Sequence, residues 1–147
     1  RRSVKREIYK TSGEEETIAL GRTLADRWQR PCVILLIGSM GAGKTTMAKG
    51  IAAGAGAAGE DEVSSPTFPL IHEYGDPVSV YHIDLYRLDT VEEVEHIGLE
   101  EIMERPALIV LEWAERFPGI LPRRRVEVRI ESDGAEGRTI EVTEHGD

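Results

Sequence analysis

The sequence has little of what several protein classes require. It contains a single cysteine, Cys32, which excludes an intramolecular disulfide and fits the reducing cytoplasm. Its longest strongly apolar run, residues 32–37, is too short to span a membrane, and residues 1–10 lack the apolar core of a signal peptide. Positive charge is also scarce, because 18 lysines and arginines against 27 aspartates and glutamates leave a net charge of −9. That balance argues against a protein that mainly binds nucleic acid directly.

The rest of the composition is typical of one globular domain. The 147 residues are 40% apolar and 31% charged, and a chain of this length can bury a sizeable core. We therefore expect residues 1–147 to form one domain located in the cytoplasm, without membrane contact. Residues 1–10 are expected to be poorly ordered, and residues 144–147 to form a tail.

Short apolar runs alternate with helical patterns, which predicts an α/β fold with a mixed central sheet flanked by helices. The turn at Gly75-Asp76-Pro77 indicates a hairpin, so the sheet is not purely parallel. Hydroxyl groups at Thr11 and Ser12 are expected to cap the first helix, and Thr90 a later one. The predicted strands cover 32–37, 68–74, 78–85, 107–111, 125–130 and 138–142, and the predicted helices fall within 11–30, 44–53 and 91–103.

Residues 38–45, Gly-Ser-Met-Gly-Ala-Gly-Lys-Thr, match the phosphate-binding pattern G-x-x-x-x-G-K-[ST]. Glycines allow a tight curl in which successive N–H groups face one point, and the helix that follows adds its positive end. In this pattern Lys44 reaches the β- and γ-phosphates and the Thr45 hydroxyl binds magnesium. The apolar strand before the pattern and the helix after it provide the context that the motif requires.

Two acidic residues end predicted strands, as a nucleotide site with magnesium requires. Asp84 ends the run Val80–Ile83, and Glu112 ends the run Leu108–Leu111. Either residue alone would be interpreted as an ordinary surface acid, but the upstream phosphate loop favours the pair as functional. Both residues are candidates for contacting the metal and for orienting water.

Other features allow two interpretations. Residues 64–67, Ser-Ser-Pro-Thr, form either a switch segment that senses the γ-phosphate or a simple turn. Trp113 is interpreted as a packing residue rather than a base-stacking one. The four histidines have no metal-ligand spacing and are interpreted as structural or solvent-facing.

Taken in order, these motifs resemble the TsaE (YjeE) family, small P-loop ATPases of bacterial tRNA threonylcarbamoyladenosine (t6A) biosynthesis. The resemblance runs from about Thr11 to Val142. The sequence departs from the family pattern at Ser39 and Met40 in the loop and at Ala114 after Glu-Trp. The motifs are G-A-G-K-T-T at 41–46, S-P-T-F at 65–68, H-I-D-L-Y-R-L at 82–88, G-L at 98–99 and E-W at 112–113.

The resemblance implies a P-loop NTPase fold with ATP or ADP and Mg²⁺ as ligands. It implies slow, partner-stimulated ATP hydrolysis in support of the proteins TsaB and TsaD, with tRNA contacted only indirectly through that complex. It places Lys44, Asp84 and Glu112 in catalysis and Thr45, Asp84 and Glu112 at the metal. The nucleotide-binding positions it implies are Glu14, Met40, Gly41, Ala42, Gly43, Lys44, Thr45 and Thr46.

Two other functions stay open on this fold. One is a small-molecule or nucleotide kinase, although the sequence has no lid-sized insertion bearing arginines. The other is a nucleotide-gated binding module without catalysis, for which partner affinity would not depend on Lys44 or Glu112. A guanine-specific switch is disfavoured because the base-reading motif N-K-x-D is missing.

Overall fold

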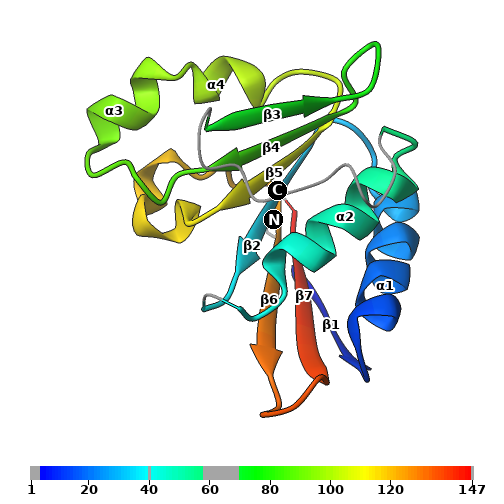
Figure 1. Cartoon of the computed structure of the whole chain (residues 1–147). Coiled ribbons are helices and arrows are strands. Elements are labelled where there is room, and N and C mark those ends of the chain that lie inside the picture. The colour runs from blue at the N-terminus through cyan, green and yellow to red at the C-terminus, as the bar shows by residue number, and fades with distance from the viewer. Residues whose placement is uncertain (1–3, 40, 58–69, 147) are drawn as a thin grey trace.

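The computed structural model describes residues 4–39, 41–57 and 70–146, and its strands form one mixed sheet (Figure 1). The strands are β1 Val4–Thr11, β2 Cys32–Ile37, β3 Ile71–Tyr74, β4 Val80–Asp84, β5 Leu108–Glu112, β6 Arg125–Ser132 and β7 Arg138–His145. The helices are α1 Glu14–Arg27, α2 Lys44–Gly54, α3 Val91–His96 and α4 Leu99–Ile102, with short 3₁₀ turns η2 Ala114–Arg116 and η3 Pro118–Ile120. The spatial order of the strands is β1-β7-β6-β2-β5-β4-β3. This arrangement confirms the predicted mixed sheet flanked by helices.

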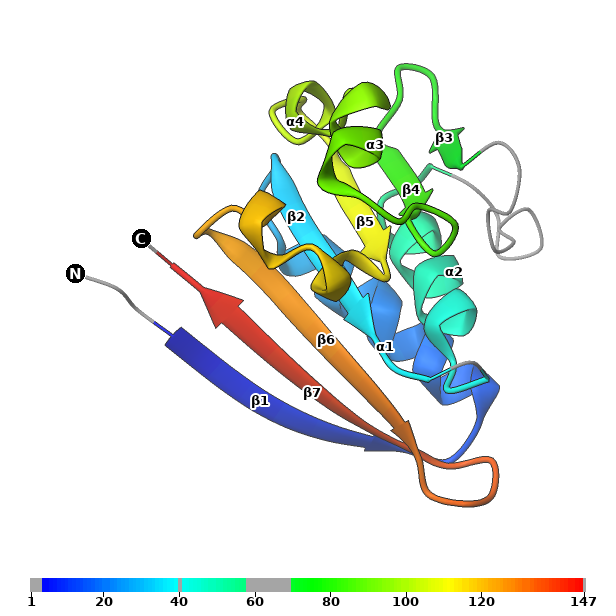
Figure 2. The same ribbon diagram turned by 90° about the vertical axis from the view of Figure 1, so that its left-hand side faces the viewer.

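The strand directions bring the ends of five strands to one edge of the sheet. Strands β4, β5, β2 and β6 pair in parallel, so their carboxyl ends lie together. Strand β1 pairs antiparallel with β7, which pairs antiparallel with β6, so β1 runs in the same direction as β2. The end of β1 and the start of α1 therefore share the edge where β2 ends, as Figure 2 shows.

Helices cover both faces of the sheet and bury two apolar clusters. On one face α1 and α2 contribute Leu24, Met47 and Ile51, which pack against Ile34 and Val128 of the strands. On the other face α3, α4 and η2 pack against the alternate residues of the central strands. Strands buried on both faces explain why 32–37 and 107–111 are continuous apolar runs.

Helices α1 and α2 approach closely because three glycines lie at their contact. A Cβ atom at Gly21 would lie 2.9 Å from the Met47 carbonyl oxygen, and one at Gly50 would collide with the Ile18 carbonyl. A Cβ atom at Gly54 would likewise collide with the Arg22 carbonyl. The contact of Gly54 with Arg22 lies four residues further along both helices than that of Gly50 with Ile18. The two helices are therefore parallel, and their first turns lie at the same end.

Several expectations about the chain ends and caps need correction. Residues 4–10 are not poorly ordered but form most of β1, and residues 144 and 145 belong to β7 rather than to a tail. Gly13 caps α1 without a side-chain bond, so the predicted hydroxyl cap is wrong. Thr11 and Ser12 contact the first turn of α1 in other ways. The hydroxyls of Thr11 and Thr17 are hydrogen-bonded to each other, and the Ser12 N–H donates to the Glu16 carboxylate.

The later elements follow the sequence pattern. Thr90 caps α3 in a capping box with Glu93, and the β3–β4 hairpin forms as predicted. Strands β6 and β7 form a second hairpin. Among the described residues, none of the helices has the length and apolar character needed to cross a bilayer.

Candidate functional site

The loop between β2 and α2 has the backbone geometry of an anion site. Gly41 and Gly43 have φ angles of 80° and 113°, a left-handed conformation that a side chain would strain. The Ala42 N–H donates to the Ser39 carbonyl at 3.1 Å, which tightens the turn. Helix α2 begins directly after Gly43, so its first N–H groups, which lack partners within the helix, face the loop. This end of α2 can therefore bind a negatively charged group.

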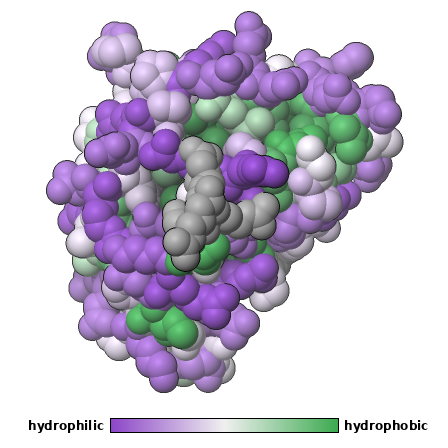
Figure 3. Space-filling view, turned by 180° about the vertical axis from the view of Figure 1, so that it is seen from behind, coloured by the Kyte–Doolittle hydropathy of each residue, from purple (hydrophilic) through white to green (hydrophobic). Residues whose placement is uncertain are grey.

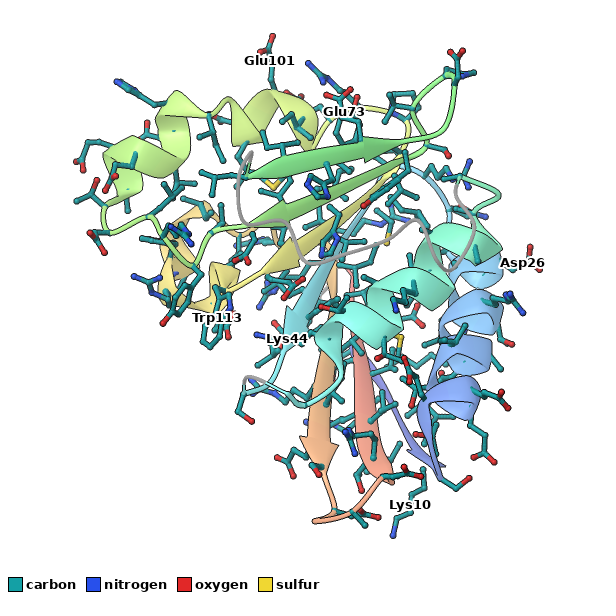
Figure 4. All side chains as sticks on the ribbon, in the orientation of Figure 1. Lys10, Asp26, Lys44, Glu73, Glu101 and Trp113 are labelled. Atoms are coloured by element: carbon teal, nitrogen blue, oxygen red, sulfur yellow. The ribbon has the colours of Figure 1, made fainter. Side chains whose placement is uncertain are left out.

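Lys44 places a buried positive charge at the same point. Its side chain is only 6% exposed, and its Nζ has no hydrogen-bond partner among the described residues. The Nζ lies 3.7 Å from the centroid of the Trp113 ring, and Figure 4 shows the two side chains near each other. A buried ammonium without a hydrogen-bonding anion is costly, and the ring compensates only in part. The site is thus built to receive an anion.

The two predicted carboxylates lie side by side opposite the loop. Asp84 and Glu112 are register partners at the ends of β4 and β5, and they are 9% and 2% exposed. Burial raises the pKa of Asp84, and the charge of Glu112 raises it further. The Tyr86 N–H, which donates to Asp84 Oδ1 at 2.9 Å, and the charges of His82 and Lys44 oppose that pKa shift. The structure thus brings together Lys44, Asp84 and Glu112, which the sequence places far apart.

The site contains a histidine that the sequence argument missed. His82 is 1% exposed, and its Nε2 lies 2.5 Å from Glu112 Oε2. An ionised carboxylate can only accept a hydrogen bond, so His82 donates and fixes the orientation of Glu112. The signal was present, because His82 and Asp84 are two residues apart on one strand and therefore share a face.

Most of the other positions that the sequence singled out lie near the phosphate loop, and some fall outside the described residues. Thr45 and Thr46 are half-buried in the first turn of α2, and Glu14 is exposed in the first turn of α1 at the same edge. Trp113 contacts Lys44 and lies 5.1 Å, ring centre to ring centre, from Tyr86. Met40 and residues 64–67 lie outside the described residues.

The oxygen donors near the loop suit a hard cation. The described residues contain no ready-made group of three histidine, cysteine or acidic side chains. Magnesium does not need one, because it usually binds one or two carboxylates together with water and substrate phosphates. The Thr45 hydroxyl and the carboxylates of Asp84 and Glu112 are donors of that kind.

A shallow cavity lies at the edge of the sheet where β1 ends. It measures about 530 Å³ and lies between the β1–α1 junction and the β6–β7 turn, lined by Thr11, Ser12, Ala135 and Gly137 among others. Arg138, the residue after Gly137, hydrogen-bonds the loop carbonyl of Ala42. No described residue of the loop lines the cavity, and Arg138 is the cavity's neighbour that contacts the loop.

A second cavity lies away from this site. It measures about 1050 Å³ and is lined by the start of β2 and by residues of α3, α4 and η3, including Trp28 and Met103. None of the predicted site residues lines it. Figure 3 views the molecule from behind and shows apolar residues gathered in the upper part of that face, beneath a polar rim.

Comparisons with known proteins agree on one family. The family model "Threonylcarbamoyl adenosine biosynthesis protein TsaE" matches residues 11–140. The tRNA threonylcarbamoyladenosine biosynthesis protein TsaE of Bacillus subtilis is 37% identical over 139 residues, covering 94% of this chain and 85% of that protein. The TsaE protein of Nostoc is 37% identical over 135 residues, covering 88% of this chain and 81% of the relative.

A solved structure gives the same result for the fold. The crystal structure of Bacillus subtilis YdiB superposes with a TM-score of 0.79 at 33% identity, covering 98% of this chain and 88% of that chain. The sheet order and the phosphate loop therefore form a P-loop NTPase fold. The match over most of the chain also confirms the resemblance drawn from the motifs: this chain belongs to the TsaE family of tRNA threonylcarbamoyladenosine biosynthesis proteins.

Proposed function

We propose that this chain binds ATP with Mg²⁺ and hydrolyses it slowly, and that this cycle supports a TsaB–TsaD complex in t6A modification of tRNA. The observation that carries the proposal is the buried Lys44 ammonium, which faces the phosphate loop with no hydrogen-bond partner among the described residues. A triphosphate would supply the missing anion. The tRNA is contacted only through the partner proteins, in keeping with the net charge of −9.

Each site residue then has a role. The loop N–H groups and Lys44 would hold the β- and γ-phosphates, and the Thr45 hydroxyl with Asp84 or Glu112 would hold the metal. Bound Mg²⁺ neutralises charge on the phosphate oxygens. Glu112, oriented by His82, positions the attacking water. The adenine base would lie toward the edge of the sheet that holds both the cavity of about 530 Å³ and the exposed Glu14.

A kinase is the weaker alternative, because two of the arginines that could have closed over an acceptor are engaged elsewhere. Arg116 donates to the carbonyl oxygens of Tyr86 and Leu88 at 2.7 and 2.9 Å. Arg105 donates to the Tyr81 hydroxyl at 3.1 Å. Both guanidinium groups thus support the fold rather than an acceptor site.

ATP turnover by the purified protein tests the proposal. We expect slow hydrolysis by the chain alone and a severalfold or larger increase when TsaB and TsaD are added together, since charge supplied in trans accelerates phosphoryl transfer. Phosphate release can be measured continuously with and without the partners. Neither binding nor hydrolysis of ATP in either mixture would contradict the proposal, and phosphoryl transfer to a metabolite would favour the kinase.

Removing the His82 donor should affect turnover more than nucleotide binding. We expect His82→Leu to lower the ATP turnover number about tenfold to a hundredfold, because outer residues that orient a reacting group have effects of that size. The affinity for ADP should change less than about threefold, since His82 contacts Glu112 rather than the phosphate loop.

His82→Gln provides the matched control, because its amide can still donate to Glu112. That variant should recover part of the lost turnover. Equal losses of turnover and of ADP affinity in His82→Leu would show that His82 has no specific positioning role.

A further inference from the structure

One guanidinium group joins the phosphate loop to the β6–β7 hairpin. Arg138 Nε donates to the Ala42 carbonyl at 2.7 Å, and Nη2 approaches the Gly41 carbonyl at 3.5 Å. On its other side Nη1 donates to the carbonyls of Gly137 at 2.8 Å and Ala135 at 3.0 Å, with the Ser132 hydroxyl at 3.5 Å. The loop and the hairpin turn are therefore held by the same side chain, although 96 residues separate Arg138 from Ala42.

The charge of Arg138 has no carboxylate partner in the described part of the chain, in contrast to that of Arg27. Arg27 faces the carboxylates of Glu7 and Glu144, which balance its charge. Arg138 donates to uncharged oxygens alone, and no acidic side chain of the described residues lies within ion-pair distance of it. Its positive charge thus stays available beside a loop suited to anions.

The bond to Ala42 also fixes the direction of a loop N–H group. A trans peptide is planar, so the N–H of Gly43 points opposite to the Ala42 carbonyl. Because Arg138 holds that carbonyl, the Gly43 N–H is held as well. A Cβ atom at Gly43 would lie 3.5 Å from Arg138 Nε, so the guanidinium is within van der Waals contact of the loop at this position too.

Arg138 also connects the loop to the neighbouring cavity. Its backbone pairs with Thr11 of β1 and Ser132 of β6. Three of these neighbours, Thr11, Ala135 and Gly137, line the cavity of about 530 Å³. Arg138 therefore links the phosphate loop to residues that border the cavity.

We propose that Arg138 is a positioning residue of the nucleotide site, which holds the phosphate loop in its binding conformation against the β6–β7 hairpin. This inference rests on the proposed function, since it assigns the loop to a nucleotide. It predicts that nucleotide affinity depends on the several hydrogen bonds that the planar guanidinium of Arg138 donates, and not on its positive charge alone.

The proposal has two tests, one of which needs no nucleotide. In Arg138→Ala we expect the affinities for ADP and ATP to fall by about tenfold or more, because two sets of charge-assisted hydrogen bonds are lost. In the nucleotide-free protein, amide hydrogen exchange should become faster in peptides covering 38–46 and 132–138. Arg138→Lys keeps the charge but not the fork, so its affinity should lie clearly below that of the wild type.

Arg129→Ala is the matched control, because Arg129 is exposed on the neighbouring strand β6 and loses the same charge. Its ADP affinity and its hydrogen exchange should equal those of the wild type, and thermal unfolding reports whether each variant is folded. Wild-type affinity and exchange in Arg138→Ala, or in Arg138→Lys if the alanine variant does not fold, would overturn the inference. If the wild-type protein bound no nucleotide, the proposed function would be contradicted. In that case hydrogen exchange still tests Arg138, and unchanged exchange at residues 38–46 in Arg138→Ala would overturn its positioning role as well.

Discussion

Lys44→Ala should weaken the binding of ADP and ATP by about a hundredfold or more. The ammonium is 6% exposed and has no hydrogen-bond partner among the described residues, so a bound phosphate would form its main charge-assisted bonds. Bonds to charged groups contribute about 1.5–3 kcal/mol each, and 1.4 kcal/mol corresponds to a tenfold change in affinity. Isothermal titration with ADP measures the loss directly.

The same variant makes a second prediction about stability. The nucleotide-free Lys44→Ala protein should unfold within a few degrees of the wild type, because the buried charge that is removed costs free energy that its contact with Trp113 only partly offsets. It should lose the increase in unfolding temperature that ADP gives the wild type.

Lys49→Ala is the control for the Lys44 variant, since it removes the same charge from the same helix, α2, five residues later. Its ADP affinity should remain within about threefold of the wild type, because the effect that we expect at Lys44 depends on position rather than on charge. An equal loss of affinity in both variants would contradict the role given to Lys44.

Glu112→Gln should slow ATP hydrolysis by about a hundredfold or more while ATP affinity changes less than about threefold. Glutamine keeps the size of the side chain and an acceptor for His82, but it loses the charge that orients and activates water. Water positioning matters chiefly in the transition state, so the turnover number should fall and binding should persist. Single-turnover hydrolysis and equilibrium ATP binding separate the two quantities.

Glu101→Gln serves as the control for Glu112→Gln, because Glu101 is exposed on α4, far from Lys44 in Figure 4. It should leave both quantities unchanged. If ATP affinity fell as much as turnover in Glu112→Gln, Glu112 would serve binding rather than the attacking water. The Mg²⁺ dependence of ATP hydrolysis, compared between Asp84→Asn and Glu112→Gln, shows which of the two carboxylates binds the metal.

The elements nearest the phosphate loop were predictable because their local signals are strong. The apolar run 32–37, the loop glycines and the helix from Lys44 all follow from spacing alone. The strand ends at Asp84 and Glu112 followed from apolar runs that stop at an acid. Parallel pairing then brings these two residues together, and the sequence argument expected that outcome.

Strand β1 was missed because its pattern is that of an exposed edge. Val4 and Ile8 are 54% and 61% exposed, whereas the more polar Tyr9 and Thr11 face inward. Charged residues fill most of the other positions, as is common on edge strands that avoid pairing with other chains. Only pairing with β7, which follows more than 120 residues later in the sequence, makes this segment a strand.

The residues that hold the site residues in place could not be predicted from local sequence patterns either. His82 meets Glu112 across 30 residues of sequence, and Arg138 meets Ala42 across 96. No spacing rule connects such residues, because the contacts depend on strand order rather than on a motif. Side chains that hold other residues in place therefore appear only once the sheet is assembled.

Multiple-turnover t6A formation on tRNA tests the central claim most directly. TsaB and TsaD are supplied with their substrates and ATP, and the modified tRNA is counted against the amount of complex, with and without this chain. We expect repeated turnovers when the wild-type chain is present and no gain over the complex alone with Lys44→Ala or Glu112→Gln. Full support of repeated turnover by Lys44→Ala, or no support by the wild type, would contradict that claim.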